Sequence, residues 1–162
     1  IYARYTGKAE ILAAVFERLL RDAMPAGPHP ADTPPGGTGG VRAELSHLGR
    51  RLAAAVMAPV TVGLNRLIAA EAHQFPEVAR VAAQLQGQAI DDVRRELERL
   101  RDRGRLPGLT DPARAARIFV EMAVGVQRGN AVLGLPMTRR ESDSLVQAAV
   151  ELFLDGCRRR NR

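Results

Sequence analysis

The chain begins with side chains whose types and spacing suit the binding of an anion: Tyr2, Tyr5, Thr6 and Lys8. Thr6 and Gly7 predict a break between two helices, because Gly often closes a helix in the left-handed conformation and Thr often caps the next one. From Lys8 onward, apolar residues recur at the spacing of one helical face. The group therefore surrounds a helix N-terminus, whose free N–H groups and partial positive charge suit a phosphate.

Signals for catalysis are weak elsewhere. The sequence has no Gly-rich phosphate loop, no Cys/His metal spacing and no Ser-centred nucleophile motif. We therefore expect neither an enzyme nor a bound cofactor. Glu71 and Glu121 are isolated carboxylates in apolar sequence, and each could either orient a ligand or form an ion pair.

Ligand binding is the chemistry that the remaining residues suggest. Apolar side chains on inward helix faces could enclose a mostly apolar cavity with a few polar groups. The same residues at helical spacing are equally compatible with an ordinary core. The predicted lining residues are Met57, Leu64, Glu71, Phe75, Leu85, Phe119 and Met122.

Composition predicts one helical domain in a reducing compartment. The chain has 162 residues, of which 46% are hydrophobic and only 4% aromatic, a balance that favours helices over sheets. Its net charge of +6 comes almost entirely from Arg and permits a polyanionic partner. The single cysteine, Cys157, agrees with the cytoplasm. No apolar run is long enough to cross a bilayer, so we expect no membrane partner.

Proline, glycine and capping signals divide the chain into about six helices. A low-complexity Pro/Gly linker occupies residues 25–40. The predicted helices cover residues 8–24, 41–57, 59–73, 76–103, 112–133 and 139–158. On the helix over 76–103, Asp91 with Arg95 and Arg94 with Glu98 are predicted as exposed i,i+4 pairs.

The last two helices are apolar around most of their circumference. Such helices are either central in a fold or lie at an interface, and burial within one subunit is the alternative to pairing. The predicted contact residues of a homodimer are Val120, Val124, Leu145, Ala149, Leu152 and Phe153.

Residues 1–12, Ile-Tyr-Ala-Arg-Tyr-Thr-Gly-Lys-Ala-Glu-Ile-Leu, resemble the end of the helix-turn-helix in tetracycline-repressor-type (TetR) transcriptional regulators. In that family a recognition helix ends in a Tyr-x-x-[Phe/Tyr] segment, and a short turn with a Lys opens the fourth helix. The chain departs from the pattern at Ala9, where a carboxylate is usual and Glu10 follows one place later. Because Ile1 lies inside the motif, we expect a fragment that lacks most of the helix-turn-helix.

The resemblance implies an all-α TetR-like ligand-binding body of about six helices, the last two forming a dimeric four-helix bundle. It divides the chain into residues 1–7, the end of the DNA-binding motif, residues 8–24, a connecting helix, residues 25–40, the linker, and residues 41–162, the ligand-binding and dimerisation domain. It implies a DNA-binding repressor that a small apolar or amphipathic effector releases from its operator, with DNA phosphates on Tyr2, Tyr5, Thr6 and Lys8. The alternative is an all-helical ligand-binding or dimerisation module without a DNA-binding role.

Overall fold

The computed structural model describes Ala14 and residues 40–157. Within them, five helices are present and no strand, which confirms the all-α fold class. The helices are α2 (Val41–Met57), α3 (Pro59–Glu71), α4 (Pro76–Asp102), α5 (Pro112–Leu133) and α6 (Arg139–Gly156). Their bounds agree closely with the predicted ones. Of the predicted helix over 8–24 only Ala14 is described, and it is helical. Of the predicted linker over 25–40 only Gly40 is described.

Local chemistry sets the ends of α5 and α6. Pro112 opens α5, and the Asp111 carboxylate accepts a bond from the Arg114 N–H at 3.0 Å. Gly134 ends this helix with φ 75°, a backbone conformation that residues other than Gly rarely adopt. A reciprocal capping box starts α6: the Glu141 N–H donates to the Thr138 hydroxyl, and the Thr138 N–H donates to the Glu141 carboxylate.

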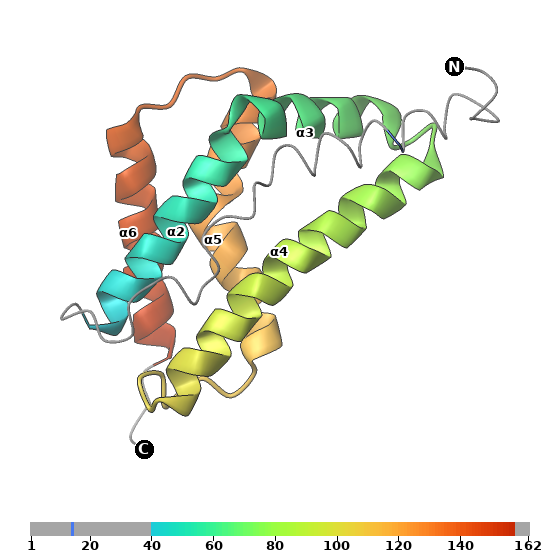
Figure 1. Cartoon of the computed structure of the whole chain (residues 1–162). Helices are drawn as coiled ribbons and strands as arrows, with labels where there is room; N and C mark the ends of the chain where they lie inside the picture. Colours follow the sequence, from blue (N-terminus) through green and yellow to red (C-terminus); the bar gives the residue numbers. More distant parts are fainter. Residues whose placement is uncertain (1–13, 15–39, 158–162) are drawn as a thin grey trace.

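The other four helices all contact α5, which makes it the central element. Figure 1 shows α3 crossing the top of the molecule from the end of α2 to the start of α4. In this view α6 lies at the left, across the molecule from α4. The long helix α4 packs along α5 through its second half, where its buried residues Val93, Leu97 and Leu100 lie.

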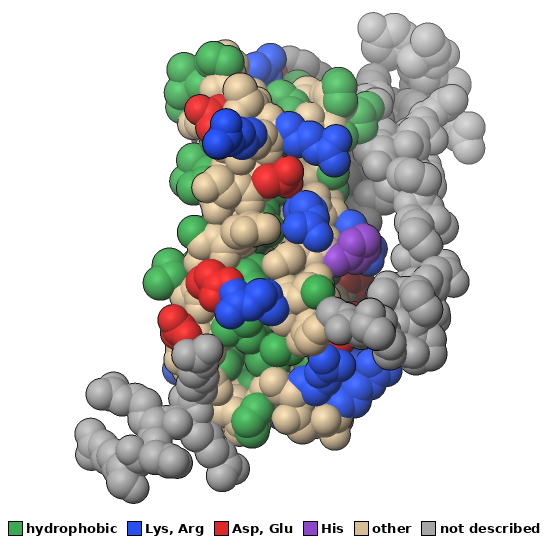
Figure 2. All heavy atoms as spheres, turned by 90° about the vertical axis from the view of Figure 1, so that its left-hand side faces the viewer, with side chains coloured by type: hydrophobic (Ala, Val, Ile, Leu, Met, Phe, Trp, Pro, Cys, Tyr) green, Lys and Arg blue, Asp and Glu red, His purple; other side chains and the backbone are tan. Residues whose placement is uncertain are grey.

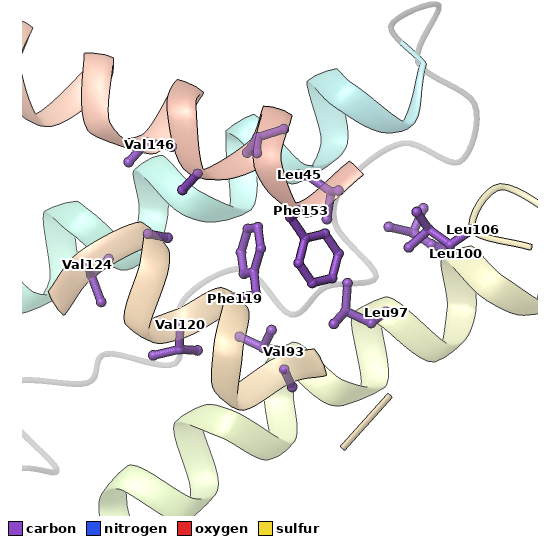
Figure 3. Packing of buried hydrophobic residues seen from close by; sticks show 14 of the residues in the cluster. Leu45, Val93, Leu97, Leu100, Leu106, Phe119, Val120, Val124, Val146 and Phe153 are labelled. Atoms are coloured by element: carbon purple, nitrogen blue, oxygen red, sulfur yellow. The ribbon is translucent and has the colours of Figure 1, made fainter. Parts of the chain in front are cut away.

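The main core forms where α2, α4, α5 and α6 meet (Figure 3). At its centre the rings of Phe119 and Phe153 meet edge to face, 5.1 Å between centroids. Leu45, Val93 and Leu97 close around them. An aromatic pair of this geometry contributes about 0.5–1.5 kcal/mol beyond the area it buries.

A second, smaller cluster lies at the junction of α3 and α4, which we call the corner. Leu64 and Val78 are buried there, and five partly buried residues pack against them: Leu67, Ile68, Ala72, Phe75 and Val81. The corner cluster shares no residue with the main core.

Ion pairs cover the outer side of α4. The Arg94 guanidinium lies 2.9 Å from the Glu98 carboxylate, as predicted, and 3.2 Å from that of Asp91. The predicted pair of Asp91 with Arg95 is wrong, because Arg95 reaches back three residues to Asp92.

The described surface mixes both signs of charge. On the face seen in Figure 2, acidic side chains lie beside basic ones. Arg42 of α2 pairs with Glu151 of α6, and Arg105 lies 3.1 Å from Glu44. None of the described helices is by itself long and apolar enough to span a membrane; α2 and α3 taken together meet that test of length and composition, but with a 64° bend between them.

Candidate functional site

The predicted phosphate contacts, Tyr2, Tyr5, Thr6 and Lys8, lie outside the described residues. Their role therefore stays a prediction.

The predicted effector-lining residues fall into two separate regions. Leu64 and Phe75 pack together in the corner cluster, and Glu71 is half-buried at the end of α3. Met57 and Leu85 are half-buried and belong to neither cluster. These five residues come from the end of α2, from α3 and its following turn, and from the first half of α4.

Phe119 and Met122 belong to the main core instead. Phe119 is fully buried, with its ring against Phe153, and Met122 packs on the outside of the same core cluster. Phe119 has no surface left for a ligand, so its assignment to the cavity is corrected. The reason is that helical spacing identifies an inward face but does not distinguish a cavity wall from a packed core.

The two isolated carboxylates have different surroundings. Glu121 accepts a bond from the Arg128 guanidinium at 2.7 Å, so it forms the ion pair that was the alternative to ligand binding. Glu71 makes no ion pair with another described residue. In the described part of the chain, no group of three or more His, Cys, Asp or Glu could hold a metal ion.

Gln127 is a buried polar residue that the sequence analysis missed. It is 1% exposed in the middle of the buried side of α5, and its side-chain amide donates to the Ala123 carbonyl at 2.8 Å. The sequence did contain a signal for its burial: Gln127 lies four residues after Ala123 and seven after Val120, on the same apolar side of the helix.

A cavity of about 370 Å³ opens at the turn between α5 and α6. Its lining residues are Asn130, Pro136, Met137, Glu141, Ser144 and Leu145. None of them belongs to the predicted effector site, but Leu145 belongs to the predicted subunit contact.

Four predicted contact residues are core residues of one subunit. Val120, Val124, Ala149 and Phe153 are buried in the main cluster, because α5 and α6 pack against each other and against α2. They leave no surface for a second copy, so their assignment to the interface is corrected.

Other apolar side chains on the same two helices are exposed. We call the outer apolar face the set of Ile118, Val126 and Leu133 on α5 with Leu145 and Leu152 on α6. Val126 is 56% exposed, Leu133 74% and Leu152 66%, while Leu145 is half-buried. Val126 and Leu133 are seven residues apart, as are Leu145 and Leu152, so each pair lies on one side of its helix.

Similarity to known proteins agrees with this architecture. Residues 43–156, most of the chain, match the family model described as the AefR-like transcriptional repressor, C-terminal domain. A crystal structure from Mesorhizobium loti MAFF303099, described as that of a TetR-family transcriptional regulator, has the same fold, with a TM-score of 0.75 and 21% identity. The alignment covers 95% of this chain and 77% of that one. No curated protein matches the chain significantly.

The family match spans α2 to α6, the whole of the helical body described above. The chain therefore belongs to the TetR family of transcriptional regulators and carries a C-terminal domain of the AefR-like type.

Proposed function

We propose that the chain is the effector-binding and dimerising part of a ligand-responsive repressor, which a small molecule releases from operator DNA. The outer apolar face carries this proposal, together with membership of a family of regulators whose matching domain is named for a repressor.

The outer apolar face supports a homodimer. Large apolar side chains exposed at repeated positions of two neighbouring helices mark a contact surface. Burying one such side chain stabilises an association by about 1.5–3 kcal/mol. A second copy would cover Val126, Leu133 and Leu152 with the same residues of its own, in the isologous arrangement that most dimers adopt.

The corner supports an effector site for a small apolar or amphipathic molecule. Phe75 and Leu64 supply apolar surface there. Met57 at the end of α2 and Leu85 in α4 are half-buried and are the further lining residues of this proposal, since Met adapts to ligands of varied shape. The carboxylate of Glu71 would orient a polar group of the effector.

DNA binding would come from the N-terminal region. Tyr2, Tyr5, Thr6 and Lys8 would hold phosphates, contacts that position a protein without reading bases. A dimer would place two reading heads in successive major grooves. Effector binding would shift the helix over 8–24 and favour a spacing of the heads that does not fit the operator.

The test compares two exposed apolar residues in the protein that includes its DNA-reading head. Leu152→Glu places a charge on the outer apolar face, and Val60→Glu places a charge at an exposed position of α3. A charge without a partner in an interface costs several kcal/mol, so Leu152→Glu should give a folded monomer with operator affinity at least about 100-fold lower. Val60→Glu should remain a dimer with unchanged affinity.

Light scattering measures the molar mass, and circular dichroism shows whether each variant is folded. Fluorescence anisotropy measures the affinity for DNA that is selected from a random library. A folded dimer of Leu152→Glu would place the subunit contact elsewhere. A folded monomer of the unaltered protein would rule the dimer out, and an unaltered dimer that selects no sequence would favour the module without a DNA-binding role.

A further inference from the structure

Helix α3 is held less tightly than the other described helices. Leu64 is its one buried residue, and the main core and the partly buried residues around it include none from α3. Because the free energy that holds an element scales with the apolar area it buries, α3 belongs to the least stable part of the described body.

The connection from α2 to α3 has the geometry of a hinge. Ala58 is extended, with φ −60° and ψ 135°, between two helices that meet at 64°. Pro59 has no N–H, so the hydrogen-bond ladder of α2 cannot continue into α3. A rotation of the Ala58 backbone would change the direction of α3 relative to α2, at the expense of the contacts of α3 with α4 and α5.

One exposed side chain ties α3 to the end of α5. The Arg66 Nε donates to the Val132 carbonyl at 2.8 Å, and its Nη2 donates to the Ala131 carbonyl at 2.9 Å. The Ala131 carbonyl also accepts the Gly134 N–H at 3.3 Å, and a cation at the last turn of a helix meets the negative end of the helix dipole. The two bonds therefore stabilise the end of α5 and the position of α3 together.

The end of α5 leads directly to the proposed subunit contact. Leu133 of the outer apolar face follows the two bonded carbonyls, and Gly134 then turns the chain toward α6. The guanidinium lies so close that a Cβ atom on Gly134 would come within 3.3 Å of the Arg66 Nη2. A movement of α3 would therefore change the two hydrogen bonds next to Leu133, at the edge of the outer apolar face.

We propose that α3 is a hinged element that turns about Ala58–Pro59 and that Arg66 latches it to the end of α5. In the closed state the latch fixes the corner against α5; in the open state α3 and the last turn of α5 loosen together. An effector in the corner that contacts α3 would shift this balance by its difference in affinity for the two states. That regulatory use rests on the proposed function, whereas the latch itself does not.

Hydrogen exchange measured by mass spectrometry on the 162-residue chain tests the latch without DNA or effector. Arg66→Ala should make the amides of residues 58–75 and 128–137 exchange about tenfold faster, the factor that corresponds to about 1.4 kcal/mol. Amides of residues 93–102 and 142–153 should be unchanged. Arg66→Lys should give a smaller effect, because an ammonium lacks the planar fork that spans two carbonyls.

The matched control is Arg80→Ala, which removes an exposed guanidinium whose partner, Glu77, is on the same helix; it should leave the exchange of α3 and α5 unchanged. Unchanged exchange in Arg66→Ala would overturn the latch. Equally faster exchange in all five helices, or loss of folding, would also overturn it, because Arg66 would then serve global stability. If exchange responds selectively but a protein that also carries the proposed DNA-reading head binds no operator, the latch stands and the proposed function fails.

Discussion

Phe153 and Leu152 are neighbours in α6, but their side chains lie on different sides of the helix, with exposed fractions of 6% and 66%. A turn of 100° per residue separates a core position from a surface one. A substitution of Phe153 therefore tests the stability of the subunit, and a substitution of Leu152 tests the association of two subunits.

Phe153→Ala should lower the free energy of unfolding by about 3–5 kcal/mol, because it removes the partner of the Phe119 ring and leaves a cavity. Urea denaturation at fixed protein concentration measures this. Val60→Ala, at an exposed site on α3, should change stability by less than about 0.5 kcal/mol. Equal small losses in both variants would contradict a central role for the aromatic pair.

The carboxylate of Glu141, in the cap of α6, makes the stability of the fold depend on pH. The Thr138 N–H, and then its hydroxyl, donate to the Glu141 carboxylate and hold its pKa below the ordinary value of 4.5. A carboxyl whose pKa is lower in the folded state stabilises the fold above its unfolded pKa and loses that contribution as pH falls through its folded pKa.

The melting temperature of the unaltered chain should therefore exceed that of Glu141→Gln at neutral pH, and the difference should shrink as the pH falls below about 4.5. Thermal unfolding followed by circular dichroism across this range measures it. A difference independent of pH would show that the charge of Glu141 does not contribute to the cap.

At the scale of elements, the crossing of α2 over α6 depends on one glycine. A Cβ atom on Gly49 would lie 2.6 Å from Cγ1 of Val146, closer than packed atoms approach. Val146 is itself fully buried, so it has little room to move. The distance between these helices is thus set by the absence of a side chain at one position.

Gly49→Ala should destabilise the chain by about 1–3 kcal/mol through overpacking. Gly87→Ala is the matched control, since a Cβ there meets nothing within 4 Å and Ala is the better helix former, so it should stabilise by about 0.5–1 kcal/mol. Chemical denaturation of both variants, of Val146→Ala alone and of Gly49→Ala combined with Val146→Ala measures the coupling between positions 49 and 146. Additive effects of Gly49→Ala and Val146→Ala would place the strain elsewhere.

The whole molecule consists of a four-helix core and a corner that extends from it. The core takes its residues from α2, α4, α5 and α6, and the corner from α3 and the start of α4. This division would let the proposed effector act on the corner while the core remains folded, which a ligand-responsive dimer requires.

At this scale, Lys8→Ala in a protein that also carries the proposed DNA-reading head should weaken binding to all DNA sequences alike. Loss of one phosphate contact should also lower the slope of log affinity against log salt by about one unit. Anisotropy titrations at several salt concentrations on selected and random DNA measure both. A change in base preference instead would show that Lys8 does not act through phosphate.

Local sequence signals determined the helices of the described body. The Pro residues at positions 59, 76 and 112, the Thr138–Glu141 capping box and the apolar periodicity act within a few residues, so the bounds of α2 to α6 could be predicted from the chain alone. The all-α class followed from the same signals, and the five described helices confirm it. The TetR resemblance followed from residues 1–12, and the match of residues 43–156 to a family model confirms the family.

Tertiary structure decided which apolar side chains are core and which are surface. Val120 and Val124 are buried because four helices surround α5, and Ala149 and Phe153 are buried because α6 packs on α2 and α5. Periodicity within one helix does not specify its neighbours. The contact of Arg66 with carbonyls 65 and 66 residues away was equally beyond the sequence. Helix ends depend on nearby residues, whereas the partners of a side chain depend on how distant helices pack.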